Sequence, residues 1–241
     1  MEKLEEDTQM NADENINQNN AATTQNTTPT KVQELFGGAF RIDKFPETLR
    51  DISDIVPISD NQEIFSDVNE SNPAYSGNQL IVEILQKMDK ADPDAISFSF
   101  QDLGQEAGAK DITELSVQHF HSAEEIESVM PTLSALTGCT YSVHQLKGTQ
   151  KIIPNKKQYG ERDFVTMLMC LVRLEGPYDT DLLFTFNVPD KHTDEEEDKC
   201  ETGESAAYRE FLAQSEADFK MMLSSFVVSG DQAVKDLLGM E

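Results

Sequence analysis

The stretch FVTMLMCLVRL, Phe164 to Leu174, is apolar at almost every position, and after a short turn it is followed by TDLLFTFNVP, Thr180 to Pro189. A continuous apolar run of this length is typical of a central strand that is covered on both faces. In the second stretch Leu182, Phe184 and Phe186 fall on one side of a strand, because side chains alternate between faces. The connection EGPYD is short, so the two stretches are predicted to form an antiparallel hairpin.

Other stretches extend this hairpin into a sheet. QEIFSDV (62–68) and NQLIVEIL (78–85) read as two strands around a polar loop, and TYSVHQLKG (140–148) alternates like another strand. SAAYREFLAQSEADFKMMLSSFVV (205–228) has apolar residues at helical intervals and predicts one amphipathic helix on the sheet. The predicted fold class is therefore α+β, an antiparallel β-sheet flanked by helices.

The stretch ADPDAISFSFQDL (91–103) supports two interpretations. Asp92 followed by Pro93 is a good helix start, whereas Ile96, Phe98 and Phe100 alternate like a strand. We favour the helix.

Composition divides the chain into one domain and its extensions. Residues 1–33 are rich in Asn, Thr and acidic residues and nearly lack large apolar groups, so we expect a disordered tail. Residues 34–230 are expected to form a single domain that contains a solvated acidic loop at 190–204. Residues 231–241 are expected to be a C-terminal tail.

The charge of the chain restricts its partners. A formal net charge of −26 with a pI near 4.3 argues against nucleic acid or an anionic membrane as the partner, and favours a basic protein surface.

No apolar run is long enough to span a membrane, and the acidic start does not resemble a signal peptide. The three cysteines are far apart, which suggests a reducing compartment without a disulfide framework.

Little in the sequence supports catalysis. His119 and His121 would lie on one face of a strand and could hold a metal ion if a third ligand, such as His144, came from a neighbouring strand. We instead expect two surface histidines, because the sequence does not assign that third ligand. No G-x-S-x-G, H-E-x-x-H or activated cysteine pattern is present, so we predict neither an enzyme nor a cofactor.

Glycine pairs and charge clusters offer further candidates. Gly37 and Gly38 lack the Gly-Lys-Ser/Thr continuation of a phosphate loop, so we expect a bulge or a close backbone approach in an edge strand.

One basic stretch stands out in this acidic chain and could guide an acidic segment of a partner, although such clusters are usually solvated loops. Its members are Lys147, Lys151, Lys156, Lys157 and Arg162.

The stretch DNQEIF, Asp60 to Phe65, places two carboxylates three residues apart where a strand is predicted to begin. On its own, Asp60 would form a turn or cap with a nearby backbone N–H, and Glu63 would be an exposed strand residue. If the stretch is extended, Glu63 and Phe65 share a face and could form an aromatic anchor with a charged rim.

Four stretches together resemble one family. LFGGAF (35–40), DISDIVPISDNQEIF (51–65), QLIVEIL (79–85) and YDTDLLFTFNVP (178–189) occur in the same order as in the Ran guanine nucleotide release factors, the Mog family. The resemblance covers about residues 35–228 in outline. It implies a Mog/PsbP-like fold, an antiparallel sheet flanked by helices.

The resemblance also implies a function. The family binds the GTPase Ran, promotes release of its guanine nucleotide and supports nuclear protein import. We also expect a monomer, and a location in both nucleus and cytoplasm. The acidic positions implicated in Ran binding fall on Asp60 and Glu63, with Asn61 and Gln62 matching between them and Phe65 as the expected anchor. Ser59 stands where the family commonly has proline, which leaves the turn less preorganised. The alternatives are a scaffold of the same fold with another partner and a metal-dependent enzyme using His119 and His121.

Overall fold

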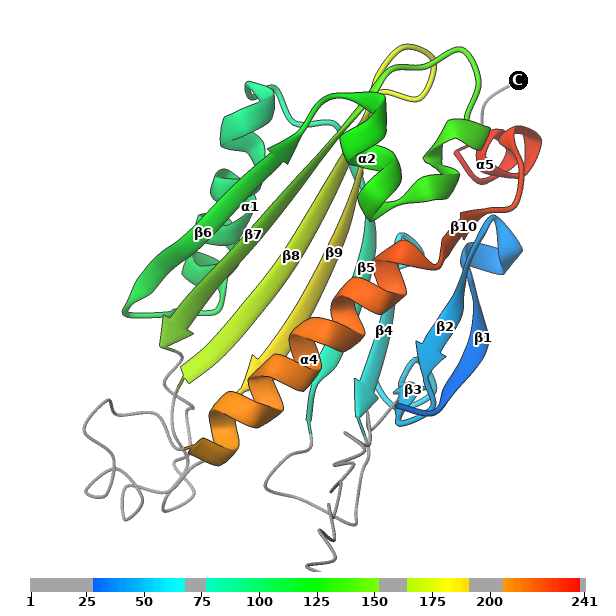
Figure 1. Ribbon diagram of the computed structural model, residues 1–241. Helices are drawn as coiled ribbons and strands as arrows, with labels where there is room; N and C mark the ends of the chain where they lie inside the picture. Colours follow the sequence, from blue (N-terminus) through cyan, green and yellow to red (C-terminus); the bar gives the residue numbers. More distant parts are fainter. Residues whose placement is uncertain (1–27, 68–76, 152–163, 191–205, 239–241) are drawn as a thin grey trace, which may run out of the picture.

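The computed structural model describes residues 28–67, 77–151, 164–190 and 206–238. These form a seven-stranded and a three-stranded antiparallel sheet, with helices packed on the larger sheet (Figure 1). The predicted α+β architecture is therefore confirmed.

The larger sheet has the strand order β3-β4-β5-β9-β8-β7-β6. Its strands are β3 (Leu49–Asp51), β4 (Gln62–Asp67), β5 (Gln79–Gln86), β6 (Ile112–Phe120), β7 (Tyr141–Lys151), β8 (Phe164–Leu174) and β9 (Thr180–Pro189). The smaller sheet, in the order β1-β2-β10, contains β1 (Thr30–Leu35), β2 (Phe40–Pro46) and β10 (Phe226–Val228).

The helices are α1 (Asp92–Glu106), α2 (Ala123–Val129), α4 (Ala206–Ser224) and α5 (Asp231–Leu237), with 3₁₀ turns η1 (Phe36–Gly38) and η3 (Pro131–Ala135). Within the described residues, no helix has both the length and the apolar character needed to cross a membrane.

The predicted hairpin lies at the centre of the larger sheet. Strands β8 and β9 pair in register from Val165 opposite Pro189 to Leu174 opposite Thr180. Because side chains alternate, the hairpin contributes to a separate apolar cluster on each face of the sheet. On one face, Phe186 stacks on Phe219 of α4 at a centroid distance of 5.8 Å.

Helix α1 covers the opposite face. Its Ala95, Ile96 and Phe100 are buried with apolar residues of β7, β8 and β9. The Phe100 ring lies so close to Gly148 of β7 that a side chain there would collide with it. The helical interpretation of 91–103 is thus confirmed, because Ile96 and Phe100 lie one turn apart and are buried on the sheet, whereas Phe98 between them is 42 % exposed.

A buried arginine fixes the start of α1 to the sheet. The Arg173 guanidinium, 0 % exposed, donates hydrogen bonds to Asp92 at 2.8 Å and to Asp181 at 3.1 Å. It also donates to the backbone carbonyls of Met88 and Lys90. Because a buried charge is costly without partners, this set of bonds defines one position for α1.

The C-terminal region differs from the sequence-based expectation. The predicted helix over 205–228 ends at Ser224, and Phe226 to Val228 instead form β10, which pairs with β2. Residues 231–237, expected to belong to a tail, form α5, and Val234 is fully buried. Phe226 fits the helical spacing, but extending the chain there places its ring against Phe40.

The N-terminal boundary of the folded domain also differs from the predicted one. Strand β1 begins at Thr30, inside the predicted tail of residues 1–33, and pairs with β2. Most of that tail (1–27) and nearly all of the predicted acidic loop (191–204) lie outside the described residues.

Candidate functional site

All of the residues predicted to bind a partner except Phe65 lie at one corner of the molecule, which we define as η1 (36–38) together with residues 51–63. Here the loop between β3 and β4 runs into the first residues of β4, while η1 connects β1 to β2. A hydrogen bond joins the two parts, since the Glu63 carboxylate accepts from the backbone N–H of Phe36 at 2.5 Å.

This hydrogen bond holds a turn of unusual backbone conformation. Phe36 has φ 49°, and Gly37 and Gly38 follow with φ 64° and 90°. A bulky residue at positive φ is strained, and only glycine adopts such angles freely. The glycine pair therefore forms a tight turn between strands, where the sequence suggested a bulge or close approach within an edge strand.

Glu63 is half-buried at this contact. Burial raises the pKa of its carboxyl, the bond from the Phe36 N–H lowers it, and the nearby Asp51 raises it. This hydrogen bond fixes the shape of the corner, and the carboxylate keeps further lone pairs, so Glu63 stays a predicted partner contact.

The side-chain amides of the same motif also bind the protein itself. Asn61 donates to the carbonyl of Ile84 at 3.0 Å, and its own backbone carbonyl accepts from the Ile84 N–H at 2.9 Å. Gln62 donates to the carboxylate of Glu83. Of the two predicted acidic contacts, Asp60 is the exposed one, so it remains accessible to a partner.

Phe65 does not lie on this surface. It shares a face with Glu63, as predicted, but that face points into the core, where Phe65 is 1 % exposed and its ring lies 4.9 Å from that of Phe45. The expected aromatic anchor is therefore corrected to a core residue. The side chain points to the face of the sheet where Phe45 of β2 and the main core cluster cover it.

Two apolar side chains that the sequence analysis did not single out are exposed at the corner. Ile55 is 79 % and Val56 is 43 % exposed, although both are aliphatic and adjacent. Their N–H groups donate to the carbonyl of Ile52, and the Ser53 N–H donates to the Asp51 carboxylate. The loop is thus held by its own hydrogen bonds while it presents an apolar tip between acidic residues.

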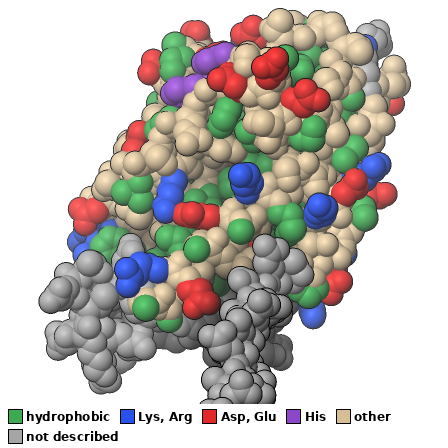
Figure 2. All heavy atoms as spheres, in the orientation of Figure 1, with side chains coloured by type: hydrophobic (Ala, Val, Ile, Leu, Met, Phe, Trp, Pro, Cys, Tyr) green, Lys and Arg blue, Asp and Glu red, His purple; other side chains and the backbone are tan. Residues whose placement is uncertain are grey.

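Three histidine side chains lie close together elsewhere: His119 on β6, His121 directly after β6, and His144 on β7. The His119 and His144 rings touch through their Nδ1 atoms at 2.9 Å, and the His121 ring centre lies 5.7 Å from that of His144. The space-filling view shows histidine side chains together at the surface, near acidic side chains (Figure 2). His119 and His121 are exposed, as expected, whereas His144 is fully buried.

This cluster does not resemble a metal centre. The Nε2 atom of His144 lies 3.0 Å from the Ser142 hydroxyl, so both of its ring nitrogens already have hydrogen-bond partners. Across the described ranges, no group of His, Cys, Asp and Glu side chains is arranged to hold a metal ion. Burial and the neighbouring His119 lower the pKa of His144 to about 4.

The predicted basic stretch is only partly described. Lys147 forms an ion pair with Glu216 at 2.6 Å, and the ammonium of Lys151 lies over the Phe164 ring. Lys156, Lys157 and Arg162 fall outside the described residues.

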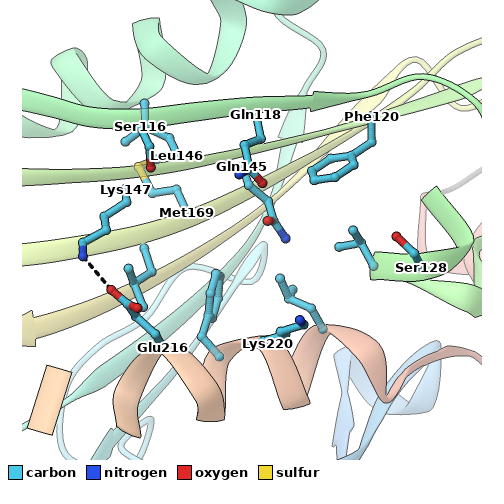
Figure 3. A pocket seen from close by; sticks show the side chains of 14 residues that line it. Ser116, Gln118, Phe120, Ser128, Gln145, Leu146, Lys147, Met169, Glu216 and Lys220 are labelled. Atoms are coloured by element: carbon cyan, nitrogen blue, oxygen red, sulfur yellow. Dashed lines mark hydrogen bonds and ion pairs between the residues drawn. The ribbon is translucent and has the colours of Figure 1, made fainter. Parts of the chain in front are cut away.

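The Lys147–Glu216 pair crosses a hollow of about 550 Å³ between the sheet and α4. Figure 3 shows Gln118 and Gln145 of the sheet facing Glu216 and Lys220 of α4 across it. The pair is partly exposed, so it orients α4 with a small contribution to stability.

Comparison with known proteins places the chain in a family. The family described as "Ran-interacting Mog1 protein" matches residues 33–189, which include the whole corner. The chain belongs to the Mog1 family. The resemblance inferred from the four sequence motifs is thereby confirmed.

Relatives of known name support the Mog1 assignment. The chain is 35 % identical over 165 residues to the Ran guanine nucleotide release factor of Homo sapiens and 32 % identical over 165 residues to that of Bos taurus. Each alignment covers 67 % of this chain and 77 % of the relative.

Solved structures show the same Mog1 fold. The Saccharomyces cerevisiae Ran-binding protein Mog1p aligns with a TM-score of 0.54 at 20 % identity, covering 86 % of this chain and 99 % of that one. A point mutant of protein Mog1 aligns with a TM-score of 0.52 at 21 % identity, covering 85 % of this chain and 98 % of the other.

Proposed function

We propose that this Mog1-family protein binds the GTPase Ran, promotes release of its guanine nucleotide and thereby supports nuclear protein import. The observation that carries the proposal is the family match over residues 33–189, because it contains the complete corner. Relatives that align with this chain over 165 residues bear the name Ran guanine nucleotide release factor.

The corner provides a suitable contact surface. Ile55 and Val56 form an apolar tip that a partner can desolvate, and exposed Asp54 and Asp60 surround it with negative charge. Buried apolar anchors with a charged rim are typical of binding hot spots. The overall charge of −26 accelerates encounter with a basic surface of Ran.

Glu63 acts through the shape of this surface. Its hydrogen bond to the Phe36 N–H joins η1 to β4, and β4 follows directly on the loop that carries the tip. Because preorganised loops lose less entropy on association, this bond favours binding by fixing the shape of the contact surface.

Nucleotide release follows from linkage and needs no catalytic group. If the protein binds nucleotide-free Ran more tightly than nucleotide-bound Ran, reciprocity requires that it weaken nucleotide affinity by the same factor. The protein acts as a monomer in this scheme and works in both nucleus and cytoplasm.

Calorimetry with purified Ran tests the proposal. The protein is titrated into nucleotide-free Ran and into GDP-loaded Ran, with an Ile55→Asp variant in parallel. We expect a one-to-one complex that is tighter with nucleotide-free Ran and is lost in the variant. Absence of binding to either form would refute the proposal and indicate that the fold serves another partner.

A further inference from the structure

A cavity of about 340 Å³ lies on the α1 side of the larger sheet, under the C-terminal end of that helix. Strands β5, β8 and β9 supply its floor, and Leu103 and Ala107 supply its cover. This cavity, which we call the α1-side cavity, adjoins the corner through the hydrogen bond from Gln62 to Glu83. Its volume lies in the range of small-molecule sites.

Two polar atoms in the wall of this cavity have no hydrogen-bond partner within the described part of the chain. Thr185, which is 1 % exposed, leaves its Oγ1 unpaired, and Asn187 leaves its Oδ1 unpaired. Both residues lie on β9 with two-residue spacing, so their side chains point to the same side of the sheet. Because unpaired buried polar atoms are costly, a ligand that supplies hydrogen-bond donors would stabilise this wall.

The buried acid Glu83 lines the same cavity as Thr185 and Asn187. Glu83 of β5 is 8 % exposed and lines the same cavity, two residues from Ile81, which pairs with Thr185. Its carboxylate accepts a hydrogen bond from Gln62. Burial raises the pKa of Glu83, and the charged group that acts on it through space is another acid, Glu106 of α1.

The remaining wall is largely apolar. Ile81, Leu103, Val165 and Met167 contribute aliphatic or thioether surface, and none of the described lining residues is aromatic. Such a wall fits an alkyl chain.

We propose that the α1-side cavity binds a small aliphatic ammonium compound, with its charged head at Glu83, Thr185 and Asn187 and its alkyl chain along the apolar wall. All three polar side chains can accept the hydrogen bonds that an ammonium group donates. The acidic chain attracts a cation and repels an anion of the same shape.

The test compares three probes of equal chain length with the full chain: hexylammonium, hexanol and hexanoate. Calorimetry at neutral pH should show one-to-one, saturable binding of hexylammonium. Hexanol should bind about tenfold more weakly or worse, because hydrogen bonds that involve a charged group are the stronger ones. Equal binding of hexanol, preferential binding of hexanoate, or no binding of hexylammonium would each overturn the proposal.

Two variants locate the site. Glu83→Gln keeps the shape of the side chain and should abolish the preference for hexylammonium over hexanol. Thr185→Val should weaken hexylammonium binding about twofold to tenfold. Glu127→Gln, which changes an exposed acid on α2, serves as the matched control and should bind like the wild type. Circular dichroism checks the fold of each variant, and an unchanged preference in folded Glu83→Gln would contradict the assignment.

Discussion

The carboxylate of Glu63 and the backbone N–H of Phe36 are 27 residues apart in sequence and 2.5 Å apart in the structure. The bond connects two motifs that lie apart along the chain, LFGG and DNQE. It explains why an acid at position 63 serves the corner even though it is half-buried.

Replacement of Glu63 tests this structural role. Glu63→Ala leaves the Phe36 N–H without its acceptor and should lower the free energy of unfolding by about 1 to 3 kcal/mol. Glu63→Gln keeps an acceptor oxygen and should cost less. Urea denaturation measures both changes, and equal loss in the two variants would contradict the role of the hydrogen bond.

Asp60 should behave differently, because it is exposed. Asp60→Ala should leave the urea midpoint unchanged but slow association with Ran, and the difference should shrink as salt is raised. Stopped-flow association at low and high ionic strength checks this. Glu127→Ala on α2 is the control for the loss of one negative charge, and an equal effect there would show that only net charge matters.

The apolar tip gives a separate prediction. Ile55→Ala removes exposed apolar surface that is buried only in the complex, so affinity for Ran should fall by about 1 to 2 kcal/mol while stability stays the same. Calorimetry and urea denaturation measure the two quantities. Leu115→Ala provides the matched control, since Leu115 is another exposed aliphatic residue, at the far edge of the sheet on β6. If both substitutions have the same effect on affinity, the tip is not the contact.

Buried His144 predicts a pH dependence of stability. Its pKa is about 4 in the folded protein, against an ordinary value of 6.5, because of burial and the neighbouring His119. Between these values the unfolded chain binds a proton that the folded protein rejects, so stability falls as pH drops from 6.5 toward about 4. Asp92 opposes this shift, and His121 and Arg173 add to it.

The measurement is the urea midpoint at a series of pH values for the wild type and for His144→Gln. The difference between the two should shrink or reverse as pH falls through this range. Exposed His121→Gln should stay close to the wild-type curve, because His121 makes only a minor contribution to the pKa shift of His144. Parallel curves for wild type and His144→Gln would exclude His144 as the source of the dependence.

Periodic patterns account for the elements that were predictable from the sequence. The β8–β9 hairpin could be predicted from an apolar run and a strict alternation of apolar residues. Both patterns reflect burial of the side chains in the sheet, and no other tertiary contact changes the conformation of these strands. Strand β10 and helix α5 were missed because their residues are few and their state is decided by tertiary partners. Phe226 has helical spacing from Phe219, yet it extends to pair with Ile42 of β2.

The candidate site was predictable in part. The motif pointed to the right corner, but Phe65 was assigned to the surface because alternation shows which residues share a face and not which way that face points. Ile55 and Val56 were missed because exposed apolar residues in a loop have no periodic signal. The proximity of His144 to His119 was foreseen only as one option, and the pairing of β6 with β7 brings the two together.

The most direct test of the central claim is the affinity of Ran for a fluorescent guanine nucleotide, measured with and without saturating amounts of this protein. We expect Ran to bind the nucleotide more weakly when this protein is present, by the same factor that separates the affinities of this protein for nucleotide-free and nucleotide-bound Ran. An unchanged nucleotide affinity at saturation would contradict the central claim.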